Sequence, residues 1–287
     1  MTLRQIDNIF QGRPTSDGAG VKLYRAFTPS VPNIDPFLML DEISSDNSSD
    51  YMGGFPDHPH RGFETVSYML QGKIRHTDHL GNEGLLEDGA VQWMTAGRGV
   101  IHAEMPEKTD DGLHGFQLWI NLPSHLKMQP AKYQEYSSDS FPVVCFGTQP
   151  AFNHVKVIAG RFIQTKHTTE GVKGPVTNIA THANYYDVTI GKDQVLSFST
   201  YPEHTVLLYC FEGSINIAGK ILHNGQTAKL SYGEGVSLKA EVDARLLVLT
   251  GKPIGEPVVN YGPFVMNTSE EIDQAIRDYQ TGNLVAR

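Results

Sequence analysis

Two short motifs carry the residues best suited to chemistry. His58-Pro59-His60 and His102-Ala103-Glu104 each place two potential metal ligands two positions apart. In a β-strand, residues i and i+2 point to the same face with Cα atoms roughly 6.6 Å apart, so such a pair can converge on one ion. Two strands of this kind lying side by side would offer His58, His60, His102 and Glu104 to one metal. Nitrogen and oxygen donors without a thiolate favour a divalent first-row metal with open coordination positions over a closed structural zinc site.

Glu64 is the competing carboxylate, because it follows His60 at a spacing that also returns to the His60 face. Four residues along a straight strand span about 13 Å, twice the reach of an i, i+2 pair. We therefore prefer Glu104 as the metal ligand and expect Glu64 to lie behind the ligands or to pair with an arginine. The remaining histidines, His76 among them, are assigned no ligand role.

The elements that must position these residues are short strands. The chain contains 28 glycines and 16 prolines, scattered between β-branched and aromatic runs, a pattern typical of an all-β protein. Thr65-Val66 before Gln71-Gly72 is repeated as Thr205-Val206 before Glu212-Gly213. This repeat predicts a duplicated β-barrel or sandwich domain. We expect domains at 1–135 and 136–287, separated near a stretch rich in Ser, Pro, Lys and Gln.

The second domain is expected to lack a metal site. When Thr205 is aligned on Thr65, Phe198 and Thr200 take the positions of His58 and His60, and residues 236–242 contain no histidine. The sequence therefore predicts one metal per chain, held by the first domain.

One helix is expected near the end of the chain. Thr268 and Glu271 have the spacing of a capping box, apolar residues recur at helical spacing from Ile272 to Tyr279, and Gly282 stands where a helix would end. The helix should pack its apolar stripe against the sheet.

Composition excludes several classes of function. The 287 residues carry 23 Lys and Arg against 32 Asp and Glu, a formal net charge of −9, so direct nucleic-acid binding is not expected. The longest apolar run, 206–211, is far shorter than the ~20 residues of a membrane span, and the first residues do not resemble a secretion signal. We expect a cytoplasmic protein. Cys145 and Cys210 show no partner pattern, and both are expected to be buried small apolar residues.

Several short sequence motifs resemble those of the pirin family of the cupin superfamily. One of them is the run from His58 to Val66, in which His-x-His-x₃-Glu is the cupin pattern. The others are spread over the whole chain: Asp17-Gly18-Ala19-Gly20-Val21, Asp35-Pro36-Phe37-Leu38, Leu118-Trp119-Ile120-Asn121-Leu122-Pro123, Lys127-Met128 and Pro263-Phe264-Val265-Met266-Asn267-Thr268. The resemblance implies a bicupin, with two β-barrel or jelly-roll domains face to face, and one metal in the N-terminal barrel. It also implies that His58, His60, His102 and Glu104 are the ligands.

The resemblance further implies a metal-dependent dioxygenase that opens flavonols such as quercetin with O₂ and releases carbon monoxide. Fe(II) is the favoured metal, with Ni, Mn, Zn, Co or Cu left open, and Glu104 would take the 3-hydroxyl proton as catalytic base. The expected partner is a small aromatic substrate, and the expected state is a monomer. The alternative is a metal- or redox-sensing regulatory protein that binds a protein partner. An apolar cavity lined by residues such as Phe55 and Trp93 would favour the enzyme.

Overall fold

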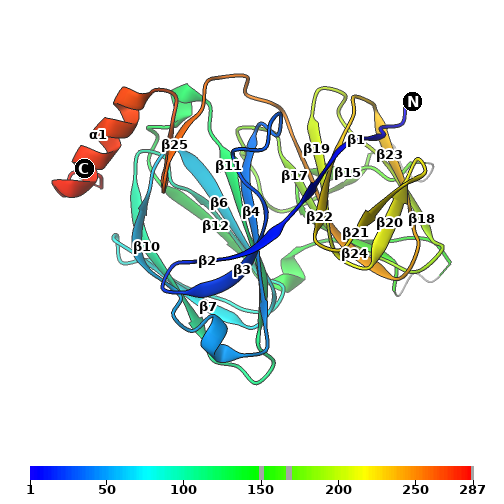
Figure 1. Ribbon diagram of the computed structural model, residues 1–287, viewed down its shortest axis with the longest axis horizontal. Helices are drawn as coiled ribbons and strands as arrows, with labels where there is room; N and C mark the ends of the chain where they lie inside the picture. The colour runs from blue at the N-terminus through cyan, green and yellow to red at the C-terminus, as the bar shows by residue number, and fades with distance from the viewer. Residues whose placement is uncertain (149–151, 166–169, 286–287) are drawn as a thin grey trace. The chain divides into compact units, whose positions relative to one another are not determined.

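The computed structural model describes residues 1–148, 152–165 and 170–285, which form two compact units of β-strands (Figure 1). The N-terminal unit comprises Pro14–Ser30, Phe37–Ser138 and Ile254–Arg287, and the C-terminal unit comprises Met1–Arg13, Val31–Pro36 and Asp139–Pro253. The central division at Ser138 lies near the expected domain boundary after residue 135. The two ends of the chain, however, are exchanged between the units.

Strand pairing explains the exchange of the chain ends. Strand β1 (Ile6–Gln11) pairs antiparallel with β22 (Gln226–Leu230) and so extends a sheet of the C-terminal unit. At the other end of the chain, Phe264 of β26 (Phe264–Met266) forms a parallel bridge with Arg61 of the N-terminal unit. Both are terminal segments that add to an existing edge, and their own residue pattern does not identify the sheet they join.

The N-terminal unit consists of a seven-stranded sheet of order β12-β9-β6-β11-β4-β3-β2, a four-stranded sheet of order β5-β10-β7-β8, and the hairpin β25-β26. The strands are β2 (Arg13–Asp17), β3 (Val21–Phe27), β4 (Phe37–Ser45), β5 (Phe55–His60), β6 (Phe63–Gln71), β7 (Lys73–Asp78), β8 (Glu83–Leu86), β9 (Val91–Thr95), β10 (Val100–Glu107), β11 (Leu113–Asn121), β12 (Lys132–Tyr136) and β25 (Val259–Tyr261), with short 3₁₀ turns η1 (Ser48–Asp50) and η2 (Ser124–Leu126). A third such turn, η3 (Ser138–Ser140), stands at the division between the units.

The C-terminal unit repeats this plan. It has a seven-stranded sheet of order β1-β22-β19-β24-β17-β14-β13, a four-stranded sheet of order β18-β23-β20-β21, and the pair β15-β16. The strands are β13 (Val143–Cys145), β14 (His154–Ala159), β15 (Arg161–Phe162), β16 (Val172–Lys173), β17 (Asn184–Ile190), β18 (Val195–Ser199), β19 (Thr205–Glu212), β20 (Ser214–Ile217), β21 (Lys220–His223), β23 (Gly235–Ala240) and β24 (Ala244–Gly251).

The matching strand orders confirm the internal duplication. Strand β6, which begins at Phe63, corresponds to β19, and β5 corresponds to β18, so the repeated Thr-Val words stand on equivalent strands. The chain is therefore an all-β protein with two units of the same topology, as expected. In this correspondence β1 fills the position in the C-terminal unit that β12 fills in the N-terminal unit.

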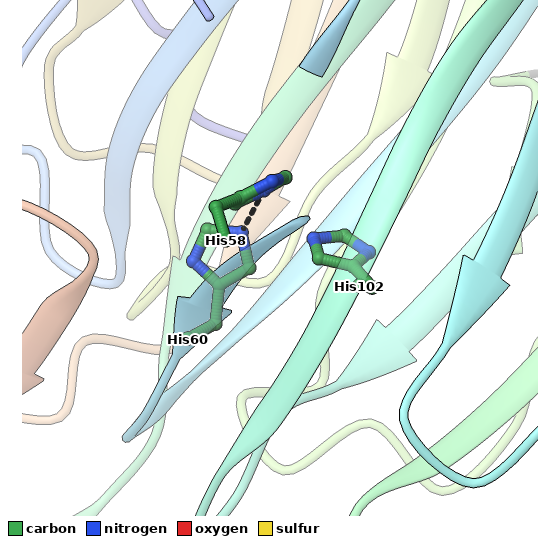
Figure 2. A group of neighbouring side chains, drawn as sticks. All are labelled: His58, His60 and His102. Atoms are coloured by element: carbon green, nitrogen blue, oxygen red, sulfur yellow. Dashed lines mark hydrogen bonds between the residues drawn. The ribbon is translucent and has the colours of Figure 1, made fainter. Parts of the chain in front are cut away.

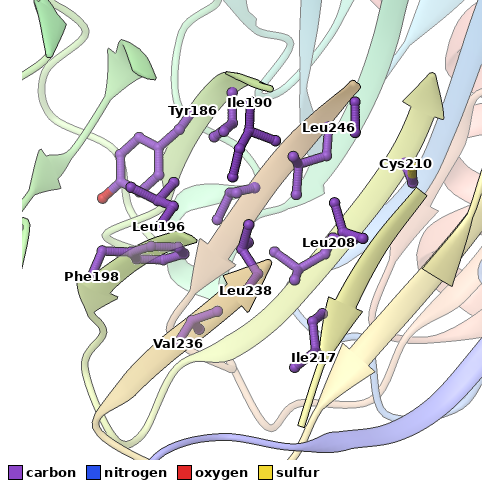
Figure 3. Packing of buried hydrophobic residues seen from close by; sticks show 14 of the residues in the cluster. Tyr186, Ile190, Leu196, Phe198, Leu208, Cys210, Ile217, Val236, Leu238 and Leu246 are labelled. Carbon is purple, nitrogen blue, oxygen red and sulfur yellow. The ribbon is translucent and has the colours of Figure 1, made fainter. Parts of the chain in front are cut away.

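The interior of the C-terminal unit is an apolar core (Figure 3). Tyr186, Leu196, Phe198, Val236 and Leu238 all lie within it and are at most 2% exposed. Inward side chains at alternate positions of two facing sheets bury this area together, which is the main driving force for folding such a unit.

The predicted C-terminal helix is present as α1 (Ser269–Gln280). Thr268 caps it, with both hydrogen bonds of the capping box to Glu271 in place. Its buried residues Ile272 and Ala275 join a cluster with Phe264 of β26. The helix therefore packs through its apolar stripe, as expected, but it belongs to the N-terminal unit and not to the domain 136–287 in which the sequence placed it. No helix in the described part of the chain is long and apolar enough to cross a membrane.

The cysteine prediction is half right. Cys210 is buried on β19, whereas Cys145 is exposed at the end of β13, which is the edge strand of its sheet. A residue on an edge strand has a neighbouring strand on one side only, so the small apolar character of cysteine did not secure its burial.

Candidate metal centre

Three histidine side chains converge in the N-terminal unit (Figure 2). His58 and His60 lie on β5 and His102 lies on β10; the two strands pair antiparallel, and His102 stands directly opposite His58. One ring nitrogen from each residue lies within 4.8 Å of those of the other two. The two motifs thus lie on adjacent strands, the arrangement in which their side chains could share one ion.

The ring nitrogens are arranged as a bound cation would require. Nδ1 of His58 lies 2.9 Å from the carbonyl oxygen of Pro56, to which it donates, so Nε2 of His58 carries a lone pair. This Nε2 lies 3.0 Å from Nε2 of His60. Nε2 of His102 is buried without a hydrogen-bond partner in the described structure, and Figure 2 shows one ring nitrogen of His102 directed toward the other two rings. The three residues therefore fit a divalent metal that takes imidazole nitrogen.

Burial keeps two of these imidazoles neutral. Loss of solvent, followed by the neighbouring His58, lowers the pKa of His60 well below its ordinary value of 6.5. Burial also lowers the pKa of His102 well below 6.5, with smaller contributions from His60, His58 and His76. Only a neutral imidazole has a lone pair to give a metal, so burial favours the ligating form.

The Glu104 carboxylate lies beside this cluster, two residues after His102 on β10, and is 6% exposed. Its Oε1 lies 2.9 Å from the Ser67 hydroxyl, and its Oε2 lies 3.5 Å from Nε2 of Gln117. The Ser67 hydroxyl is also 2.6 Å from Oε1 of Gln117, and its single proton serves one acceptor at a time. Ser67 and Gln117 thus hold the carboxylate in the same interior as the imidazoles, although Glu104 is outside the 4.8 Å group formed by the described residues.

Glu64 belongs to a different environment. It lies on β6, where Ser67 points toward Glu104, so residue 64 points to the opposite face of the sheet. The carboxylate accepts a hydrogen bond of 2.7 Å from the Thr95 hydroxyl, and burial raises its pKa. The arginine partner expected for Glu64 is not found among the described residues.

The aromatic residues near the histidines differ in part from those expected. The Phe55 ring lies 6.5 Å from that of His58, as expected for a residue at the site. Trp93, in contrast, is opposite Val66 in the register of β6 and β9 and so faces away from Ser67 and the histidines. Trp119 of β11 takes its place, with its ring 5.4 Å from that of His60. The sequence of β9 does not show which of its two faces is directed toward the histidines, and the register with β6 decides it.

The end of β5 is fixed by a tight turn. Gly62 has φ +91°, and a Cβ there would lie 2.0 Å from the carbonyl oxygen of Val265, so only glycine fits. The buried Lys127 donates to the carbonyl oxygens of Gly62 at 2.7 Å and Val265 at 3.0 Å, and to Oδ1 of Asn121 at 2.6 Å. These contacts attach β26 to the turn that follows His60.

Arg61 adds a second attachment at the same place. Its guanidinium is buried, with Nη1 2.7 Å from Oδ2 of Asp278 on α1, and it also donates to the carbonyl oxygens of Arg98 and Leu284. The strand that carries two of the histidines is therefore connected directly to the C-terminal helix.

His76 is a histidine near the site to which the sequence analysis assigned no role. It lies on β7, opposite Glu104 in the register with β10, and its Nε2 lies 2.9 Å from Nδ1 of His102. It is 1% exposed, and burial lowers its pKa. Spacing along one strand cannot reveal such a residue, because its partner stands on the neighbouring strand.

The equivalent position in the C-terminal unit holds apolar residues. Phe198 of β18 stands directly opposite Val236 of β23, just as His58 stands opposite His102. Both side chains are fully buried in the core shown in Figure 3. Among the residues that the structure describes, these three histidines are the one group of at least three His, Cys, Asp or Glu side chains whose ligand atoms lie close enough together to hold a metal ion.

Comparison with known proteins gives consistent matches over the chain. Residues 20–120 match the family model described as Pirin, and residues 185–285 match the Pirin C-terminal cupin domain. A Pseudomonas aeruginosa protein named "Putative quercetin 2,3-dioxygenase" is 46% identical over 98% of both chains.

Solved structures agree with these matches. The crystal structure of quercetin 2,3-dioxygenase from Acinetobacter baumannii is 35% identical, with a TM-score of 0.89 and coverage of 99% of each chain. The bacterial pirin YhhW from Escherichia coli, in complex with nickel(II), has a TM-score of 0.62 over 86% of this chain and 100% of its own. At 19% identity the latter likeness shows the fold alone.

Proposed function

Because the chain belongs to the pirin family, we propose that it is a metal-dependent dioxygenase that opens flavonols such as quercetin with O₂ and releases carbon monoxide. The observation that carries this proposal is the convergence of three imidazoles beside a buried carboxylate in one of two otherwise equivalent units. The names of the Pseudomonas and Acinetobacter relatives point to the same reaction.

In this proposal His58, His60 and His102 hold one divalent metal, and Glu104 completes the ligand set. Fe(II) is the metal we favour, and Ni, Mn, Zn, Co and Cu are alternatives, since sites with nitrogen and oxygen donors accept several divalent ions. When bound, such a metal supplies a Lewis acid with open coordination positions. The substrate is a small aromatic molecule, and the rings of Phe55 and Trp119 offer it an apolar contact.

Glu104 is the proposed catalytic base. A flavonol must lose its 3-hydroxyl proton when that oxygen coordinates, and a carboxylate beside the metal can take it. The structure supports this role because Ser67 and Gln117 hold the Glu104 carboxylate in the interior that also contains the three imidazoles. The same two residues can keep the carboxylate in place while it carries the proton. Both oxygen atoms of O₂ would enter the ring-opened ester, and the carbon that bore the 3-hydroxyl would leave as carbon monoxide.

The test combines metal analysis with turnover. Protein purified without added metal is analysed for its elements, then loaded separately with each candidate ion and supplied with quercetin and O₂. We expect one tightly bound ion per chain, quercetin bleaching with matching O₂ uptake, and two ¹⁸O atoms from ¹⁸O₂ in the product.

Bleaching no faster than that caused by the free ion would refute the enzyme and favour the regulatory alternative, a metal- or redox-sensing protein that binds a protein partner. Two tightly bound ions per chain would contradict the prediction that only the N-terminal unit binds metal. The monomeric state and the cytoplasmic location stay predictions.

A further inference from the structure

His76 and His102 form a buried pair of imidazoles at the edge of the candidate metal centre. Nε2 of His76 and Nδ1 of His102 are 2.9 Å apart, and the two side chains are 1% and 0% exposed. A hydrogen bond between two neutral imidazoles has one donor nitrogen and one acceptor nitrogen. The proton of this hydrogen bond is therefore carried either by Nε2 of His76 or by Nδ1 of His102. Which nitrogen holds it decides whether His102 can ligate through Nε2.

We propose that His76 is a positioning residue for the metal centre: its Nε2 accepts a hydrogen bond from the Nδ1–H of His102, which leaves the Nε2 lone pair of His102 free for the metal. The inference rests on the proposed metal site and adds to it a residue outside the ligand set. Histidine ligands commonly donate their second ring nitrogen to a carboxylate, a carbonyl or water, which fixes the tautomer and the ring plane. Here a second imidazole occupies that place.

The opposite tautomer is disfavoured by what surrounds His102. A proton on its Nε2 would be a buried donor, and this atom has no hydrogen-bond partner in the described structure. An unsatisfied buried donor costs about 1–3 kcal/mol. A proton on Nδ1, in contrast, has Nε2 of His76 as a ready acceptor at 2.9 Å.

The side chain of His76 is held in place by its strand register and by a neighbouring aromatic ring. It stands opposite Glu104 on the neighbouring strand β7, so its side chain leaves the sheet on the same face as those of His102 and Glu104. Tyr133, on β12 of the other sheet, has its ring 5.3 Å from the ring of His76. The imidazole of His76 is therefore held between a ligand and an aromatic ring, which limits the rotation of both histidines.

The neutral acceptor also has an electrostatic consequence. With three imidazoles and one carboxylate, a divalent ion keeps a net positive charge. A carboxylate in the place of His76 would withdraw part of that charge through His102, whereas an imidazole orients His102 without adding an anion. His76 thereby preserves the Lewis acidity that the proposed reaction uses.

Two variants of His76 separate its hydrogen bond from its packing. His76→Gln keeps an acceptor close to the position of Nε2, and His76→Phe keeps the bulk and removes the acceptor. His114→Phe is the matched control, because it removes a partly buried imidazole of the same unit that instead contacts Glu42 at 2.8 Å. For each protein, the Ni(II) Kd is measured by chelator competition, and the free energy of unfolding is measured on metal-free protein.

We expect His76→Phe to weaken Ni(II) binding about 10- to 100-fold, the usual range for losing such an outer partner, with His76→Gln and His114→Phe within about 3-fold of wild type. No weakening in His76→Phe would overturn the proposal. Equal weakening in His76→Phe and His76→Gln would also overturn it, because the effect would then come from packing.

A measurement on the wild type does not depend on any variant folding. Ring ¹⁵N NMR of the metal-free protein reports the tautomer of His102, and we expect the Nδ1–H form. An Nε2–H form would overturn the inference even if His76→Phe bound metal poorly. Neither measurement uses quercetin or O₂, so a failure of the proposed reaction and a failure of this inference give different results.

Discussion

Replacing Asp278 by asparagine should destabilise the N-terminal unit, because it breaks the ion pair between α1 and Arg61. Arg61 directly follows His60, its side chain is 4% exposed, and its Nη1 lies 2.7 Å from the Asp278 carboxylate, which is 21% exposed. Arg61 lowers the pKa of Asp278 below its ordinary value, and the hydrogen bond between the two side chains is the largest cause.

The expected size of the effect follows from this geometry. Removing one partner of a fully buried ion pair costs about 3–5 kcal/mol. Here Asp278 is partly exposed, asparagine keeps a neutral oxygen, and Arg61 keeps the carbonyl oxygens of Arg98 and Leu284. We therefore expect a loss of about 2 kcal/mol in the free energy of unfolding, or a fall of about 4–8 °C in Tm.

Urea unfolding at pH 7, followed by fluorescence, measures this loss. Asp273→Asn is the control, because Asp273 is an exposed aspartate on the same helix, and it should change stability by no more than about 0.5 kcal/mol. Since the folded-state pKa of Asp278 is lowered, its contribution is present above the unfolded pKa near 3.9 and is lost as the pH falls through the folded value. If Asp278→Asn and Asp273→Asn are equally stable at pH 7, the ion pair does not hold the helix and our reasoning is wrong.

Three further predictions concern the site and the C-terminal unit. Glu104→Gln should reduce quercetin turnover by about 10²- to 10⁴-fold, measured on samples matched for metal content; turnover within 10-fold of wild type would exclude Glu104 as the base. His102→Ala should remove most Ni(II) affinity in chelator competition and Glu64→Gln little, and equal losses would show that the carboxylate was misassigned. Burial lowers the pKa of His204 to about 4, so this group should cost up to about 3 kcal/mol of stability as the pH falls from 6.5 toward 4. Urea unfolding at pH 7 and pH 4.5 should show a smaller decrease for His204→Gln than for wild type.

The part of the site that could be predicted is the part encoded within single strands. The i, i+2 spacing of His58 with His60 and of His102 with Glu104 predicted two strands with convergent side chains, and β5 and β10 are adjacent. The replacement of the candidate ligands in the second unit could also be predicted, because Phe198 and Thr200 align with His58 and His60 when the two Thr-Val repeats are superposed.

What the sequence did not reveal depends on contacts between strands. His76 has no partner on its own strand, and it approaches His102 only because β7 pairs with β10 in one particular register. Trp93 and Trp119 lie on strands whose successive side chains point to opposite faces of the sheet. A shift of one residue in the strand register would therefore exchange the face directed toward the histidines with the opposite face. The membership of β1 in the C-terminal unit likewise depends on which sheet edge is open, a property of the assembled unit and not of residues 6–11.

The exchange of the chain ends has a consequence for synthesis on the ribosome. Strand β1 is translated long before its partner β22, which begins only at Gln226, so β1 cannot form this pairing until the chain has been made as far as β22. The N-terminal unit, which carries the three histidines, lacks α1 until the chain has been translated past Gln280. Neither unit can therefore complete its structure as an early co-translational intermediate. A cut between Ser138 and Asp139 would produce two fragments that each lack a segment, and the halves should regain the native structure only when they are present together.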